Sequence, residues 1–119
     1  MANVLVVDDE FFIREYLEEV LVEMGHAVRQ AGDGLEAWEA LQTGARPDLI
    51  VLDLMMPRLS GWELLDRIGA DVRLAGTPIL IVSGAGDVAA EGRRYGVRGV
   101  LAKPFRPADL ENAIRACVE

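Results

Sequence analysis

The sequence predicts an α/β fold in which a five-stranded parallel sheet has helices on both faces. First, five short apolar runs alternate along the chain with segments of helical periodicity, and the joining loops are short. Strict alternation of this kind is typical of parallel sheets in which each crossover contains a helix. Second, the runs at residues 4–7 and 49–52 are apolar at every position. Continuous apolar runs suit strands that are buried on both faces.

The first strand is predicted at residues 3–7, and the first two helices have clear boundaries. The first helix follows Asp9 and ends at Gly25, because glycine is favoured at the position just after a helix C-terminus. Its apolar residues recur at helical spacing, at positions 13, 17, 20, 21 and 24. After a second strand at residues 27–31, the second helix runs from Asp33 to Gly44. Glu36 lies three residues after Asp33, which is the spacing of a capping box.

The remaining elements follow in the same alternation, with strands at residues 48–52, 78–82 and 97–102. Ser60 and Glu63 form a second capping box at the start of the third helix. A fourth helix around residues 87–95 is the weakest, because glycines at positions 84, 86 and 92 lower its helix propensity. The fifth helix begins at Pro107, a residue favoured in the first turn, and buries positions 110, 113, 114 and 117.

Composition limits the class of protein and its partners. A chain of 119 residues suits one domain, and we expect residues 1–119 to form it with no output domain attached. The net charge of −8 argues against binding to nucleic acid or to anionic membranes, so we expect partners to be proteins. No apolar run approaches the ~18 residues of a membrane span, and we expect no signal peptide, because the predicted first strand begins at residue 3. The single cysteine, Cys117, fits a reducing cytoplasm.

Two of the apolar runs end in aspartate. Asp8 and Asp9 follow the first strand, and Asp53 follows the third. Ligands of such sheets bind beyond the carboxyl ends of the strands, so we expect these carboxylates to meet at one edge. At ~4 Å and an effective dielectric of about 20, each like-charge pair costs roughly 4 kcal/mol. Such a group needs a cation, and oxygen ligands favour Mg²⁺.

The other strand ends contribute a hydroxyl and an ammonium. Ser83 follows the fourth strand, and Lys103 follows the fifth. Of the 12 basic residues, Lys103 is the only lysine, and all others are arginine. Chance can explain one lysine, and Ser83 can be an ordinary turn residue. The alternative is a site in which three acids, a hydroxyl and an ammonium hold a divalent metal and a phosphoryl group.

Four segments closely resemble the receiver domain of two-component response regulators, and we expect the stand-alone single-domain form. They are residues 6–10 (VVDDE), 53–61 (DLMMPRLSG), 82–84 (VSG) and 103–105 (KPF), in that order and at the ends of the expected strands. Each segment is weak by itself, but the four together are specific. The resemblance extends over essentially the full chain and implies a flavodoxin-like (βα)5 fold.

The resemblance also implies roles for individual residues. Asp53 would accept a phosphoryl group from a histidine kinase or a histidine phosphotransfer protein. Mg²⁺ would be bound by Asp9 and Asp53 directly, by Asp8 mostly through water, and by the carbonyl of Met55. Lys103 and the Ser83 hydroxyl would contact phosphoryl oxygens, Gly84 beside them would leave room for a small phosphodonor, and the Lys103–Pro104 peptide would be cis. The phosphorylated protein would signal to a downstream effector by protein contact, catalysing only its own phosphorylation and dephosphorylation.

The chain departs from the family pattern in the switch region. Receivers usually have Tyr or Phe three positions before the lysine, whereas this chain has Val100. The expected switch residues are therefore Ser83 and Val100, and the aromatic half of the usual switch is absent. We expect activation to order or shift residues 84–92 instead. Met55 and Ala85 occupy the positions that tune hydrolysis of the phosphoaspartate, and neither can orient a water molecule. Slow self-dephosphorylation is therefore expected.

Other interpretations remain open from the residues alone. Asp8 and Asp9 could cap the first helix, and Arg14 could form an i,i+4 ion pair with Glu18 on a solvated face. A receiver that binds partners without phosphorylation is disfavoured by the complete set of acid, hydroxyl and ammonium residues. A phosphatase with an aspartyl-phosphate intermediate would need an acid soon after Asp53, where the sequence has leucine and methionine.

Overall fold

The computed structural model describes residues 1–56, 58–84, 92 and 95–118. The elements in chain order are β1 (Asn3–Val7), α1 (Phe11–Glu23), β2 (Ala27–Ala31), α2 (Gly34–Thr43), β3 (Leu49–Leu52), α3 (Gly61–Ala70), β4 (Ile79–Ser83), β5 (Gly99–Ala102) and α5 (Pro107–Val118). The predicted fourth helix falls mostly outside the described residues, as do Ala85 and most of the expected switch segment.

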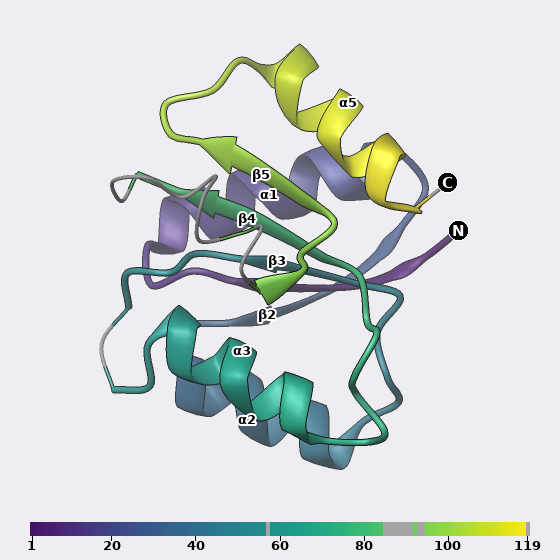
Figure 1. Cartoon of the computed structure of the whole chain (residues 1–119). Helices are drawn as coiled ribbons and strands as arrows, with labels where there is room; N and C mark the ends of the chain where they lie inside the picture. The colour runs from purple at the N-terminus through teal and green to yellow at the C-terminus, as the bar shows by residue number, and fades with distance from the viewer. Residues whose placement is uncertain (57, 85–91, 93–94, 119) are drawn as a thin grey trace.

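Within the described residues, five parallel strands form one sheet in the order β2-β1-β3-β4-β5 (Figure 1). This is the flavodoxin-like order of a doubly wound sheet. The predicted fold class is therefore confirmed. The strand boundaries differ from the prediction by one or two residues at four places. Strand β3 starts at Leu49 rather than at residue 48, β4 covers residues 79–83 rather than 78–82, and β5 starts at Gly99 rather than at residue 97.

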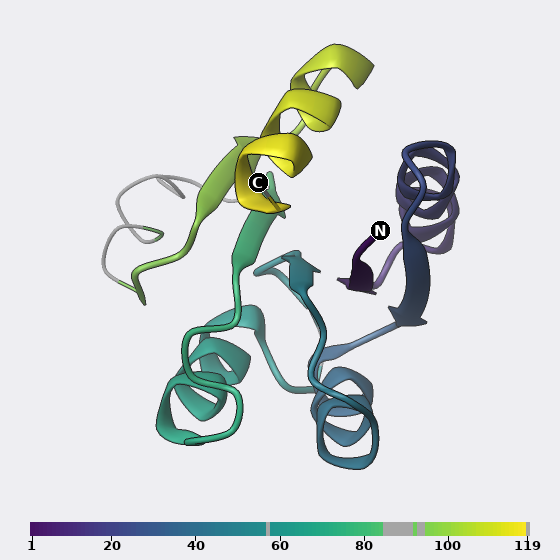
Figure 2. The same cartoon turned by 90° about the vertical axis from the view of Figure 1, so that its right-hand side faces the viewer.

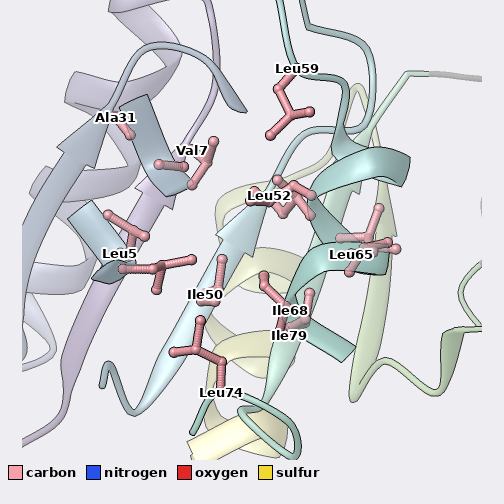
Figure 3. Close-up of a cluster of buried hydrophobic side chains, with 14 of the residues drawn as sticks. Leu5, Val7, Ala31, Ile50, Leu52, Leu59, Leu65, Ile68, Leu74 and Ile79 are labelled. Carbon is pink, nitrogen blue, oxygen red and sulfur yellow. The ribbon is translucent and has the colours of Figure 1, made fainter. Parts of the chain in front are cut away.

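Helices cover both faces of the sheet, with α1 and α5 on one face and α2 and α3 on the other (Figure 2). Alternate residues of the central strands face the two layers. Ile50, Leu52 and their neighbours pack against α2 and α3 (Figure 3), whereas Leu49 and Val51 pack against α1 and α5. Every residue of β3 and β4 is buried, as predicted for strands covered on both faces.

The predicted helix signals are confirmed in the structure. The Asp33 side chain accepts a hydrogen bond from the Glu36 N–H (2.8 Å), and the Ser60 hydroxyl accepts one from the Glu63 N–H (3.3 Å). Gly25 adopts φ +92°, a conformation that favours glycine, immediately after the C-terminal turn of α1. In the described residues, no helix is long and apolar enough to cross a membrane.

Candidate functional site

The carboxyl edge of the sheet brings Asp8, Asp53 and Lys103 together from the ends of three different strands. The ammonium Nζ of Lys103 lies 2.9 Å from Oδ2 of Asp8 and 3.5 Å from Oδ2 of Asp53. Asp8 is 1% exposed and Asp53 is 5% exposed, so two carboxylates are nearly buried around one ammonium. The predicted meeting of these strand ends is therefore observed.

Asp8 connects this ion pair to the start of α1. Its Oδ1 accepts a hydrogen bond from the Glu10 N–H (2.9 Å), while its Oδ2 faces Lys103. Glu10, not Asp8 or Asp9, is the residue preceding α1, and its side chain makes no capping hydrogen bond. The interpretation of the two aspartates as helix caps is thus not what the structure shows.

Asp53 has an unusual environment for a carboxylate. Burial, the largest influence, raises its pKa, and the nearby negative charge of Asp8 raises it further. Hydrogen bonds from the Met55 N–H (3.1 Å) and from Ser83, together with the charge of Lys103, act in the opposite direction without cancelling the rise. The net effect is a carboxyl whose pKa lies above its ordinary value.

Lys103 is held by the acids that surround it. Burial lowers its pKa, but the hydrogen bond to Asp8 and the charges of Asp8, Asp53 and Glu10 together raise the pKa above its ordinary value. The residue is therefore protonated at neutral pH. Its peptide bond with Pro104 is cis, as the resemblance predicted.

Three consecutive acidic residues at this edge offer oxygen donors for a divalent cation. Among the described residues, carboxylate oxygens of Asp8, Asp9 and Glu10 lie within 4.8 Å of one another. Asp8 is buried, whereas Asp9 and Glu10 are exposed, so this oxygen cluster opens to solvent. Hard oxygen ligands of this type suit Mg²⁺. Glu10 was not among the predicted ligands, although it directly follows the two aspartates in the sequence.

The other predicted residues lie at the same edge. Ser83, the last residue of β4, is fully buried and bonds to Asp53. A Cβ placed on Gly84 would lie 3.9 Å from Cβ of Lys103, so Gly84 is beside the ammonium-bearing residue. Met55 is 59% exposed and contributes its backbone N–H to Asp53.

Backbone carbonyls of Asp53 and Leu59 lie close to the first residues of α3 and α2. A Cβ on Gly34 would collide with the Leu59 carbonyl oxygen, and a Cβ on Gly61 would lie 2.7 Å from the Asp53 carbonyl oxygen. Arg58 adopts φ +67° and pairs with Asp33 at 3.1 Å. Residues 58 and 59 therefore lie against the start of α2, and neither Gly34 nor Gly61 has room for a side chain.

Val100, the position that usually has an aromatic residue, lies in β5 opposite Ile81 of β4. It is half-buried and packs against the core cluster on the α2 and α3 side. A Cβ on Gly92 would lie 2.5 Å from a methyl group of Val100, so these two residues are in close contact. The β5 side chain that contacts Gly92 is therefore a small valine and not an aromatic ring.

The fold and this edge define a class: a flavodoxin-like domain with an acid and ammonium pocket at the carboxyl ends of its strands. A family model of the response regulator receiver domain matches residues 4–115 of the chain. The chain therefore belongs to the receiver domain family of two-component response regulators. Phosphorylation on an aspartate is implied for this family.

Individual relatives agree with this assignment. The chain is 40% identical over 116 residues to the probable transcriptional regulator ycf27 of Guillardia theta, covering 96% of this chain and 44% of that protein. It is 32% identical to the chemotaxis protein CheY1 of Helicobacter pylori, covering 94% of this chain and 93% of CheY1. The structure of Vibrio cholerae chemotaxis protein CheY4 has 34% identity and a TM-score of 0.88, with 98% of both chains covered. The chain spans about half the length of several curated relatives that it matches.

Proposed function

We propose that this receiver domain accepts a phosphoryl group on Asp53 from a histidine kinase or a histidine phosphotransfer protein. The observation that supports this proposal is the position of Asp53: it lies 3.5 Å from Lys103 and is hydrogen-bonded through the Met55 N–H. A carboxylate in such a place can act as a nucleophile while a cation beside it receives the incoming negative charge.

The proposed step transfers one phosphoryl group. An oxygen of Asp53 forms a bond to phosphorus while the bond from phosphorus to the donor nitrogen breaks, and the electron pair leaves with the imidazole. With acetyl phosphate as the donor, the bond to oxygen breaks and acetate leaves. Lys103 would exchange its contact with Asp53 for one with a phosphoryl oxygen, and the Ser83 hydroxyl would donate to another. Gly84 would leave space beside them.

Asp8, Asp9 and Asp53, with the Met55 carbonyl, would hold Mg²⁺, and Glu10 is close enough to Asp8 and Asp9 to contribute. The ion would neutralise charge on the phosphoryl oxygens. Without a cation, three acids would repel an anionic donor. The acidic donor set supports this requirement.

The proposed output is a changed surface that a protein effector recognises, with Ser83 and Val100 at the switch. The proposal treats residues 1–119 as one receiver domain that acts by protein contact, in the cytoplasm as is usual for this family, and that catalyses no reaction beyond its own phosphorylation and dephosphorylation. It involves neither nucleic acid nor a membrane, in keeping with the net charge of −8.

The test is incubation with acetyl phosphate and Mg²⁺ followed by intact mass measurement. The wild-type protein is expected to gain the mass of one phosphoryl group, and Asp53→Asn is expected to gain none. Asp48→Asn is the matched control, because this exposed acid lies before β3 at the opposite edge of the sheet. Phosphorylation of Asp53→Asn to the wild-type level, or no gain by the wild type, would contradict the proposal.

A further inference from the structure

Arg14, in the first turn of α1, hydrogen-bonds the backbone of the acid pair and a side chain of the neighbouring strand β2. Its Nη1 donates a hydrogen bond of 2.7 Å to the carbonyl oxygen of Asp8. Its Nε donates one of 3.0 Å to Oε1 of Gln30 in β2. The sequence predicted an ion pair between Arg14 and Glu18, but it predicted neither the Asp8 carbonyl nor Gln30 as a partner of Arg14.

The carbonyl that Arg14 binds belongs to the peptide that joins Asp8 to Asp9. The orientation of this peptide plane determines where Asp9 begins and so where its carboxylate can reach. The same turn is also held by the Asp8 N–H, which donates to the Ala31 carbonyl (3.2 Å), and by the Asp8 side chain, which accepts from Glu10. Arg14 thus supplies the contact that fixes the carbonyl side of the turn.

Arg14 is itself positioned by its surroundings. Gln30, which accepts from Arg14, donates through its Nε2 to Oε1 of Glu15 (3.1 Å). The guanidinium carbon also lies 5.7 Å from the centre of the Phe11 ring, within the range of a cation–π contact. The Arg14 guanidinium is planar and is already oriented by Gln30 and Phe11. It therefore loses little conformational freedom when it binds the Asp8 carbonyl.

We propose that Arg14 is a positioning residue for the divalent-cation site, acting through the Asp8–Asp9 peptide. This inference rests on the proposed Mg²⁺ dependence of the receiver. Arg14 touches neither the cation nor the phosphoryl group. It holds the backbone from which two of the carboxylate ligands project.

Electrostatics and positioning predict opposite effects of removing Arg14. A positive side chain near a cation site repels the cation, so removal of its charge alone strengthens Mg²⁺ binding. Loss of the contact to the Asp8 carbonyl lets the turn move and weakens binding. Contacts of this outer kind are worth about 10–100-fold in metal affinity. The direction of the change therefore identifies the role.

The experiment is calorimetric titration of Mg²⁺ into the wild-type protein, Arg14→Met, Arg14→Lys and Arg67→Met. Arg67 is the matched control, since its guanidinium also lies over an aromatic ring (5.6 Å from the Trp38 centre) but on the opposite face of the sheet. We expect Arg14→Met to bind Mg²⁺ about tenfold more weakly. We expect Arg14→Lys, which keeps the charge but lacks the planar fork, also to bind more weakly, and Arg67→Met to match the wild type.

Phosphorylation by acetyl phosphate supplies a second readout. Arg14→Met is expected to need about tenfold more Mg²⁺ for half-maximal rate, while its rate at saturating Mg²⁺ stays close to that of the wild type. Unchanged or tighter Mg²⁺ binding by Arg14→Met would overturn the proposal. So would a wild-type affinity for Arg14→Lys combined with tighter binding by Arg14→Met, because charge alone would then explain the data.

A second variant, at Gln30, makes the test independent of whether Arg14→Met folds. If Arg14→Met does not fold, Gln30→Leu removes the side chain that positions Arg14, and the same weakening of Mg²⁺ binding is expected. Unchanged binding by Gln30→Leu would then overturn the inference. A different result would refute the proposed function itself: a wild-type protein that neither binds Mg²⁺ nor gains a phosphoryl group. If the wild type binds Mg²⁺ and the Arg14 variants bind it with the same affinity, only the proposed role of Arg14 is refuted.

Discussion

Strand β3 and the residue that follows it are buried almost equally, yet they differ in what their burial does. Ile50 and Leu52 are 0% exposed and lie in the core beneath α2 and α3 (Figure 3), while Asp53 is 5% exposed. Removing an apolar side chain from water stabilises the fold. Removing a carboxylate from water costs free energy, and here Asp8 and Asp53 share the single ammonium of Lys103. The apolar interior of β3 therefore offsets the cost of burying the carboxylate at its end.

The largest expected effect comes from the apolar side of this comparison. Ile50→Ala removes buried methyl groups from the middle of β3 and leaves a cavity, so we expect a loss of about 3 kcal/mol in the free energy of unfolding. Urea denaturation measures it. Val72→Ala is the control, because Val72 is 97% exposed and its truncation is expected to change stability by less than about 0.5 kcal/mol. Equal losses in both variants would contradict the assignment of Ile50 to the core.

A smaller loss is expected when the ammonium at the strand ends is removed. Lys103→Met keeps the chain length but leaves Asp8 and Asp53 without the cation between them. Breaking a buried ion pair costs about 3–5 kcal/mol, and exposed pairs contribute up to about 1 kcal/mol. The Lys103 side chain is 18% exposed, so we expect a loss of about 2 kcal/mol in EDTA.

The same variant can be tested for compensation by a divalent cation. A cation that binds the folded state stabilises it, so the loss in Lys103→Met should be smaller in Mg²⁺ than in EDTA. Arg115→Met is the matched control, because Arg115 forms an exposed pair with Glu111 at 3.7 Å. We expect it to change stability by less than about 1 kcal/mol in either buffer. A loss in Lys103→Met no larger than that in Arg115→Met would show that the acids need no ammonium.

Most of the fold could be predicted from the sequence because its signals are local. The capping boxes at Asp33 and Ser60 and the continuous apolar run of β3 each lie within a few residues. The meeting of Asp53 and Lys103 could also be predicted, although 50 positions separate them, because parallel strands bring their carboxyl ends to one edge. Here a general rule of topology replaces local information.

The parts that sequence could not supply depend on contacts between distant segments. The close approach of Gly34 to the Leu59 carbonyl follows from how α2 and the loop after β3 pack, which no local pattern specifies. Arg14 occupies a helix position that is compatible with an ion pair on the surface. Its contact with the Asp8 carbonyl depends on Gln30 in the neighbouring strand, and pairing of α1 with β2 is set only in the folded protein.

The smallest predicted effect is a gain in stability at the functional end. Burial and the charge of Asp8 raise the pKa of Asp53 in the folded state. The folded protein therefore holds a proton on Asp53 more tightly than the unfolded chain does. The resulting stabilisation is fully present below the unfolded-state pKa and is lost as pH rises through the folded-state pKa. Above the folded-state pKa the wild type lacks it, and the cost of the buried charge remains.

Asp53→Asn cannot ionise, so in EDTA at pH 7 we expect it to melt a few degrees above the wild type. The gain should shrink as pH falls toward the unfolded-state pKa of an aspartate, because the wild type then becomes protonated as well. Asp66→Asn, a charge loss at an exposed position of α3, serves as the control and should leave the Tm unchanged. A gain that does not depend on pH, or a loss at pH 7, would mean that packing or hydrogen bonding of Asp53 outweighs its charge. Strand β3 and its end would then stabilise the fold together.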